Sequence, residues 1–142
     1  MRFLKSNNHY IIVLEKDEYV IESLKKFAAS SEAPRSGFFF GIGAVRNPKI
    51  GYFDLQDKNY AIKKLEGEFE VINITGNIGV DESSEIIVHA HICLGDKNYN
   101  VFGGHLFEAQ ISVTMELIFI PTSTISRKTD SATRLKLIRL SR

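Results

Sequence analysis

Residues 86–106 have the sequence IIVHAHICLGDKNYNVFGGHL, and this stretch determines how the rest of the chain is arranged. Residues 86–94 are rich in β-branched side chains and are apolar except for two histidines, which predicts a strand. Gly95-Asp96-Lys97-Asn98 is typical of a hairpin turn. Residues 99–106 are therefore expected to return beside the first strand.

His89 and His91 are two residues apart in this strand, so both side chains are expected on the same face. Their Cα atoms would lie about 6.6 Å apart. Two imidazoles at that spacing can bind one ion at about 2.0–2.1 Å from each nitrogen. His105 follows Gly103-Gly104, where the backbone can bend, and the hairpin brings it back beside His89 or His91. We therefore predict a metal site formed by His89, His91 and His105.

The alternative is structural: one histidine packs in the core and the others are solvated or bonded to backbone carbonyls. Cys93 lies on the same strand face, as a competing ligand or as an ordinary small buried residue. His9, the fourth histidine, begins a different predicted strand and is interpreted as a surface or structural residue. Imidazole ligands suit zinc but also copper, iron and nickel, so the pattern alone does not identify the metal.

Composition narrows the class of protein. A chain of 142 residues is expected to form a single domain over residues 1–142, and 44% hydrophobic residues exclude a disordered tail protein. One cysteine excludes an internal disulfide and suits a reducing cytosol. Residues 1–8 carry no cleavage signal, and no apolar run approaches the roughly 20 residues that span a bilayer. We expect a cytoplasmic protein with no membrane partner, and the net charge of +1 gives no general electrostatic case for nucleic acid.

The order of predicted elements favours an α+β fold with a mostly antiparallel sheet. One amphipathic helix is expected over residues 18–29, with Asp17 as its N-cap. Strands are expected over the ranges 9–15, 37–45, 49–55, 60–65, 67–79, 86–94, 99–106 and 110–120 and near 134–140. Asn47-Pro48 is interpreted as a turn. In 110–120 the alternation predicts that one face carries Ile111, Val113, Met115, Leu117 and Phe119.

These residues together resemble the PPC family (plants and prokaryotes conserved), long described as a domain of unknown function. The resemblance covers nearly the whole chain and matches the prokaryotic stand-alone type, which is related to the C-terminal domain of the plant AT-hook nuclear proteins. It rests on the motifs Gly41-Ile42-Gly43-Ala44-Val45, Tyr52-Phe53-Asp54, Gly67 to Gly76, Val88-His89-Ala90-His91, Gly103-Gly104-His105-Leu106 and Thr114-Met115-Glu116, with Arg127 and the Leu-rich tail.

The resemblance implies a homotrimer, and it implies that His89, His91 and His105 hold a metal, zinc being the one expected. It also implies a fold similar to that of acetolactate decarboxylase, a three-histidine zinc enzyme. Plant members bind AT-rich DNA through an Arg-Gly-Arg-Pro hook, which this sequence lacks. Where the plant motif begins Gly-Arg-Phe-Glu, this chain has Gly67-Glu68-Phe69-Glu70. The acid in place of arginine argues against the plant partner-binding role.

Three functions follow as hypotheses. The first is a metal-binding homotrimeric module without catalysis. The second is a zinc-dependent lyase or hydrolase, because three histidines leave a coordination position for a metal-bound water. Its candidate catalytic acid or base is Glu116 or Glu70, each flanked by apolar residues in a predicted strand. The alternative for both glutamates is a solvated, outward-facing carboxylate.

The third hypothesis is a DNA-binding regulatory protein. From residue 127 onward the chain has six cations and one acid, Asp130, for a local charge of +5. The cations are Arg127, Lys128, Arg134, Lys136, Arg139 and Arg142. Repeated in an oligomer, they would form a basic face for phosphates. The alternative is a solvated edge strand whose cations discourage edge pairing.

Overall fold

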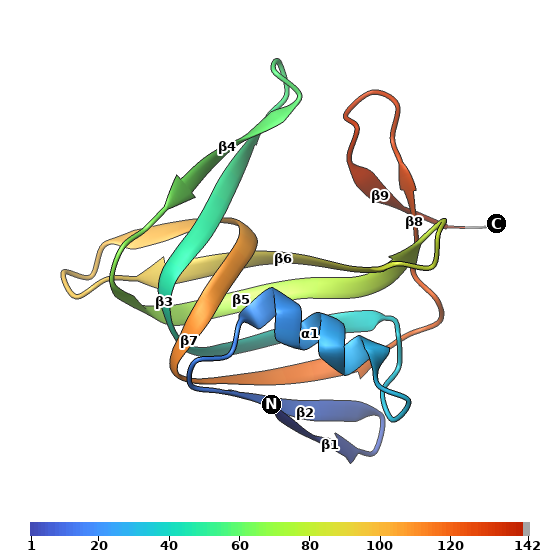
Figure 1. Ribbon diagram of the computed structural model, residues 1–142, viewed down its shortest axis with the longest axis horizontal. Helices are drawn as coiled ribbons and strands as arrows, with labels where there is room; N and C mark the ends of the chain where they lie inside the picture. The colour runs from blue at the N-terminus through green and yellow to red at the C-terminus, as the bar shows by residue number, and fades with distance from the viewer. Residues whose placement is uncertain (141–142) are drawn as a thin grey trace.

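Two long strands, β3 (Gly37–Asp54) and β7 (Val101–Pro121), run side by side through the middle of the computed structural model, which describes residues 1–140 (Figure 1). The other elements are α1 (Val20–Ala29) and the strands β1 (Arg2–Ser6), β2 (His9–Glu15), β4 (Asn59–Lys64), β5 (Glu68–Asp81), β6 (Ile86–Gly95), β8 (Ser126–Thr129) and β9 (Lys136–Arg139). Within the described residues, no helix is long and apolar enough to cross a membrane.

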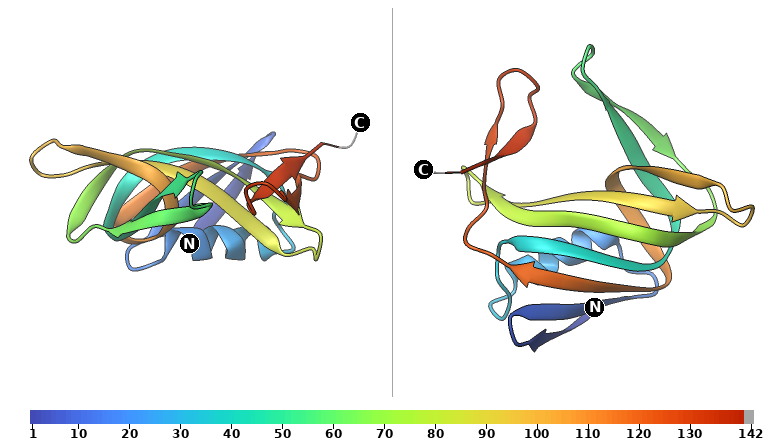
Figure 2. Two further views of the ribbon diagram at one scale, coloured as in Figure 1. Left: turned by 90° about the horizontal axis from the view of Figure 1, so that it is seen from above. Right: turned by 180° about the vertical axis from the view of Figure 1, so that it is seen from behind.

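The nine strands of residues 1–140 belong to one sheet, whose main path is β1-β2-β7-β3-β5-β8-β9. β6 pairs with both β5 and β7, and β3 pairs with β5, β7 and β4. The four strands β3, β5, β6 and β7 therefore close a circuit, which is possible because β7 bends so that its first half leaves the layer of its second half (Figures 1 and 2). The pairing of β5 with β8 is parallel, so the sheet is mixed.

The core lies between α1 and one face of this sheet (Figure 1). Phe27 of α1 packs edge-on against Phe119 of β7, with ring centroids 5.1 Å apart, and both rings are fully buried. The helix is amphipathic as its apolar spacing predicts, and its buried residues are Val20, Ser23, Leu24, Phe27 and Ala28. Burying the larger apolar ones, Val20, Leu24 and Phe27, contributes roughly 1.5–3 kcal/mol each.

The opposite face of the sheet carries an exposed row of side chains, which we call the outer row. Successive strand pairings place Leu4, Ile11, Ile118, Phe40, Thr75 and His91 next to one another across β1, β2, β7, β3, β5 and β6. Leu4 is 64% exposed and Phe40 is 49% exposed. An apolar row therefore leads across the sheet to the histidines.

Most predicted elements are confirmed, with differences at their ends. The helix begins at Val20 instead of residue 18. Asp17 is not its N-cap: it has a positive φ of 71° and pairs with Arg46, while the helix N-terminus is capped by Glu108 of β7. The sequence prediction failed here because the cap comes from a strand far along the chain.

Other differences concern strands. Asn47-Pro48 is not a turn, because β3 continues through it with a register shift, and Asn47 adopts a φ of 50°. Likewise, β7 is one strand where two were expected. Between the pairs Gly43↔Met115 and Val45↔Ile111, β7 has extra residues, and this bulge turns Val113 outward to 67% exposure. β1 and β8 were not predicted.

Candidate metal centre

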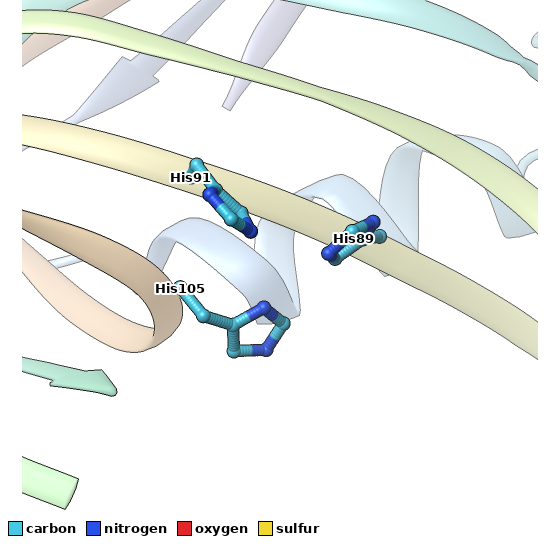
Figure 3. A group of neighbouring side chains, drawn as sticks. All are labelled: His89, His91 and His105. Atoms are coloured by element: carbon cyan, nitrogen blue, oxygen red, sulfur yellow. The ribbon is translucent and has the colours of Figure 1, made fainter. Parts of the chain in front are cut away.

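The three histidines predicted as ligands come together. His91 of β6 pairs directly with His105 of β7, and His89 lies two residues further along β6. One ring nitrogen from each of the three lies within 4.8 Å of the others. The ring centroids are 5.2 Å apart for His89 and His91, 5.2 Å for His89 and His105, and 5.7 Å for His91 and His105. Figure 3 shows the rings gathered around one shared space.

The hairpin and the close approach of neighbouring strands fix this arrangement. Asp96 accepts hydrogen bonds from the backbone N–H groups of Asn98 and Asn100, which closes the turn between β6 and β7. A Cβ on Gly104 would lie 2.7 Å from the carbonyl oxygen of Gly51, and one on Gly76 would lie 2.2 Å from that of His89. Glycine is therefore required at Gly104 for β7 to lie this close to β3, and at Gly76 for β5 to lie this close to β6.

The environment keeps two of the imidazoles neutral. Burial, and then the charges of Arg127 and His91, lower the pKa of His89 to about 4. Burial, with His89 and His91 as smaller causes, lowers the pKa of His105 to about 4. A neutral imidazole offers a lone pair at neutral pH, which is the form that binds a metal.

His105 also carries an unsatisfied nitrogen. Its Nδ1 is buried and has no hydrogen-bond partner among residues 1–140. Leaving such a group unpaired costs about 1–3 kcal/mol. A metal ion bound at this cluster fits both the three-imidazole donor set and this unpartnered atom.

Aromatic side chains surround His105. Its ring centroid lies 4.8 Å from that of Tyr60 on β4 and 5.0 Å from that of Phe107 on β7. Burial raises the pKa of the Tyr60 phenol above its ordinary value, so the neutral phenol persists to higher pH. These rings pack against the imidazole of His105.

Two hollows border the cluster. One, of about 340 Å³, is lined by His89, His91 and Phe38 on the outer face. The other, of about 230 Å³, is lined by His89, His105, Tyr60 and Arg127, and by residues of β9. Sequence reasoning assigned no role here to Tyr60 or Arg127, because each is distant in sequence and reaches the site only through sheet pairing.

The remaining candidates lie elsewhere. Glu70 and Glu116 are exposed and share a separate hollow of about 420 Å³ with Ile42 and Thr114; in the described part of the chain no histidine lines it. Cys93 is half-buried on the same face of β6 as the histidines, but it is not part of the three-ligand cluster. His9, at the start of β2, pairs with Ser6 at the far edge of the sheet.

The two lysines of the basic tail pair with acids at the turn between β5 and β6. Lys136 Nζ lies 2.6 Å from Asp81 and 3.8 Å from Glu85, and Lys128 Nζ lies 3.3 Å from Glu82. Arg127 is buried. The exposed cations of this tail in residues 1–140 that make no ion pair are Arg134 and Arg139; Arg142 lies outside the described residues.

Comparison with known proteins places this geometry in context. The model of the Plants and Prokaryotes Conserved (PCC) domain matches residues 1–123. A plant- and prokaryote-conserved (PPC) protein from Pyrococcus horikoshii is 31% identical and has a similar structure, with a TM-score of 0.82 over 99% of this chain and 96% of that one. No curated protein sequence matches the chain.

Two further solved structures are similar. A Bacteroides thetaiotaomicron protein, described as a candidate DNA-binding protein, is 27% identical with a TM-score of 0.90, covering 97% of this chain and 96% of that one. A metal-containing protein from Archaeoglobus fulgidus is 25% identical with a TM-score of 0.83, covering 99% of both chains.

The expected similarity to acetolactate decarboxylase is present but distant. The enzyme from Bacillus subtilis subspecies spizizenii is 14% identical with a TM-score of 0.55, and the match covers 86% of this chain and 57% of the enzyme. This likeness concerns the fold alone.

Proposed function

This chain belongs to the Plants and Prokaryotes Conserved domain family, and we propose that it is a zinc-binding, homotrimeric, cytoplasmic domain whose ligands are His89, His91 and His105. The observation that carries the proposal is the convergence of three imidazoles from two paired strands. The neutral state of His89 and His105 and the unpartnered Nδ1 of His105 support it further. So does the metal-containing relative from Archaeoglobus fulgidus.

Zinc is the metal proposed because three imidazoles form a common zinc donor set, and a bound zinc would supply a Lewis acid with one coordination position open. The protein's own contribution is to hold the ligands. β5 fixes both His89 and His91 by pairing them with Asn77 and Thr75, and β7 fixes His105. In a module without catalysis, water would fill the open coordination position.

A zinc-dependent lyase or hydrolase is the second candidate. Two hollows that border the histidines favour it, because they give a small molecule access to the cluster. Glu116 and Glu70 remain the proposed acid or base, although they line a different hollow. An enzyme using them would need its substrate to extend from the histidines to that hollow.

The homotrimer is proposed from the outer row. Its most exposed apolar side chains, and those of neighbouring Phe38 and Ile120, have exposed fractions between 39% and 64%. A contiguous apolar patch of this kind on a sheet face is typical of a protein interface. We propose that copies of the same chain cover it.

Metal analysis of freshly purified protein tests the metal site. We expect about one zinc per chain in the wild type and none in His91→Ala, because two imidazoles hold zinc much less tightly than three. His9→Ala is the matched control and should retain the metal. Absence of metal in the wild type, with a melting temperature unchanged by chelator, would sink the proposal.

DNA binding is the remaining candidate, favoured by the Bacteroides thetaiotaomicron relative described as a candidate DNA-binding protein. Because Lys128 and Lys136 pair with acids of the same chain, the proposed surface reduces to Arg134 and Arg139. Fluorescence anisotropy with a labelled duplex at two salt concentrations tests it. Binding that Arg134→Ala and Arg139→Ala together leave unchanged would remove this surface from consideration.

A further inference from the structure

Arg127 is a buried cation that forms no ion pair with any acid among residues 1–140. Its side chain is 5% exposed. Nη1 donates a 2.6 Å hydrogen bond to the carbonyl oxygen of Lys136, and Nη2 donates one of 2.6 Å to Oδ1 of Asn77. Both acceptors are uncharged. Nε has no hydrogen-bond partner among residues 1–140.

The acid next to Arg127 in the sheet is already paired with another cation. Asp81, which pairs with Arg127 in the β5–β8 register, instead accepts a hydrogen bond from Lys136 Nζ. Burying a guanidinium without a counter-charge is costly, and burial lowers the pKa of Arg127 accordingly. Such a group is stabilised when an anion binds beside it, and a guanidinium binds carboxylates particularly well.

The cavity beside Arg127 is open to a small molecule and leads to the histidines. It measures about 230 Å³. Its polar lining includes Arg127, His89, His105 and Tyr60, and its apolar lining includes Leu135 and Leu137. The polar part can bind a charged group, while the leucines of the β9 hairpin offer contact to a hydrocarbon portion. This mixed lining favours an organic anion over a bare inorganic one.

We propose that this cavity binds a small organic carboxylate, with its charged group at Arg127, its hydrocarbon portion against Leu135 and Leu137, and its position next to the three-histidine cluster. The inference rests on the proposed function, since it names the ligand class of the same site. The contact with Arg127, however, requires no metal.

Calorimetric titration with isobutyrate tests the proposal on zinc-loaded and on metal-free protein. Isobutyramide, a neutral molecule of similar shape, and inorganic phosphate are the comparison ligands. We expect isobutyrate to bind, and isobutyramide and phosphate to bind at least about tenfold more weakly. Arg127→Met should weaken isobutyrate binding roughly tenfold to a hundredfold. Arg139→Met, which removes an exposed arginine of the same hairpin, should leave it unchanged.

Arg127 also anchors β9, so Arg127→Met can lose its fold. Leu135→Trp is therefore included, because Leu135 lines the same cavity and its side chain takes no part in the hydrogen bonds of Arg127. It should abolish isobutyrate binding while its zinc content and circular dichroism remain those of the wild type. Unchanged binding in a folded Leu135→Trp protein would overturn the assignment.

The outcomes separate this inference from the metal proposal. Arg127-dependent isobutyrate binding in a wild type that holds no zinc refutes the metal site and supports the anion site. Zinc binding by a wild type that shows no preference for isobutyrate over isobutyramide refutes the anion site alone. Equal affinity for phosphate and isobutyrate refutes the carboxylate in favour of an inorganic anion.

Discussion

Oε1 of Glu108 accepts a 2.8 Å hydrogen bond from the backbone N–H of Ile21, a residue 87 positions earlier in the chain. Its Oε2 accepts another, of 3.2 Å, from the N–H of Glu22. A strand side chain thus satisfies two of the unpaired donors that every helix N-terminus leaves. The same contact joins α1 to β7, the strand that carries His105.

Glu108→Ala should destabilise the fold by about 1–2 kcal/mol, because it removes the cap of α1. Urea unfolding monitored by circular dichroism measures this loss. Glu66→Ala, at an exposed position, is the control and should change the unfolding free energy by less than about 0.5 kcal/mol. A Glu108→Ala protein as stable as the wild type would show that the contact does not cap the helix.

Stability should also depend on pH through Glu108. Burial raises its pKa, despite the three backbone N–H groups that favour the carboxylate. Because the folded state holds the proton more tightly, protonated Glu108 contributes to the free energy of unfolding. That contribution is complete below the ordinary glutamate pKa and is lost as pH rises through the higher pKa of the folded state. Glu108→Gln cannot ionise, so its stability relative to the wild type should improve as pH rises above about 4.5. A difference between the two proteins that stays constant from pH 4 to pH 7 contradicts this assignment.

Gly76→Ala should disrupt the metal centre without touching a histidine. The added Cβ would lie 2.2 Å from the carbonyl oxygen of His89 and 2.9 Å from the Cα of Ala90, so β5 and β6 must separate. We expect a loss of roughly 1–3 kcal/mol in unfolding free energy and a lower zinc content. In Gly95→Ala the nearest atom is the mobile end of Ile72, at 3.3 Å, and metal content should persist. Equal behaviour of the two variants would contradict this explanation.

Phe40→Asp should dissociate the proposed trimer. It places a charge at the centre of the outer row, where the side chain is 49% exposed in the isolated chain. Burying that carboxylate in an interface is costly, so association should weaken by about 100-fold or more. Sedimentation velocity at matched concentrations measures the change, and Leu55→Asp, at a 74% exposed position off this row, is the control. Trimers in both variants would place the interface elsewhere.

The histidine cluster could be predicted from sequence because it depends on local geometry. A strand alternates its faces, and a short turn at Asp96 returns the chain directly, so His105 was expected beside His89 or His91, and it pairs with His91. The burial of Phe27 and of Phe119 follows similarly from an amphipathic helix and an alternating strand, although the contact between the two rings could not be predicted.

Contacts between distant segments were beyond such reasoning. Arg127 reaches His89 only because β8 adds to β5 in parallel, through two residue pairs that leave no pattern in the sequence. Glu108 looks like any strand carboxylate until α1 lies beside it, whereas Asp17 has the right residue type and position for a cap. β1 was missed because its residues are mostly exposed and show no clear alternation.

The pairing of β6 along its whole length with β5 also limits how the sequence of this region can change by insertion or deletion. One residue added or removed between Ile86 and His89 would turn both imidazoles toward α1 and place Ala90 and Ile92 in solvent. Such a change would remove the ligands and damage the core in one step. Length variation among related chains is therefore expected at the turns, such as the one between Asp81 and Glu85, and not within this strand.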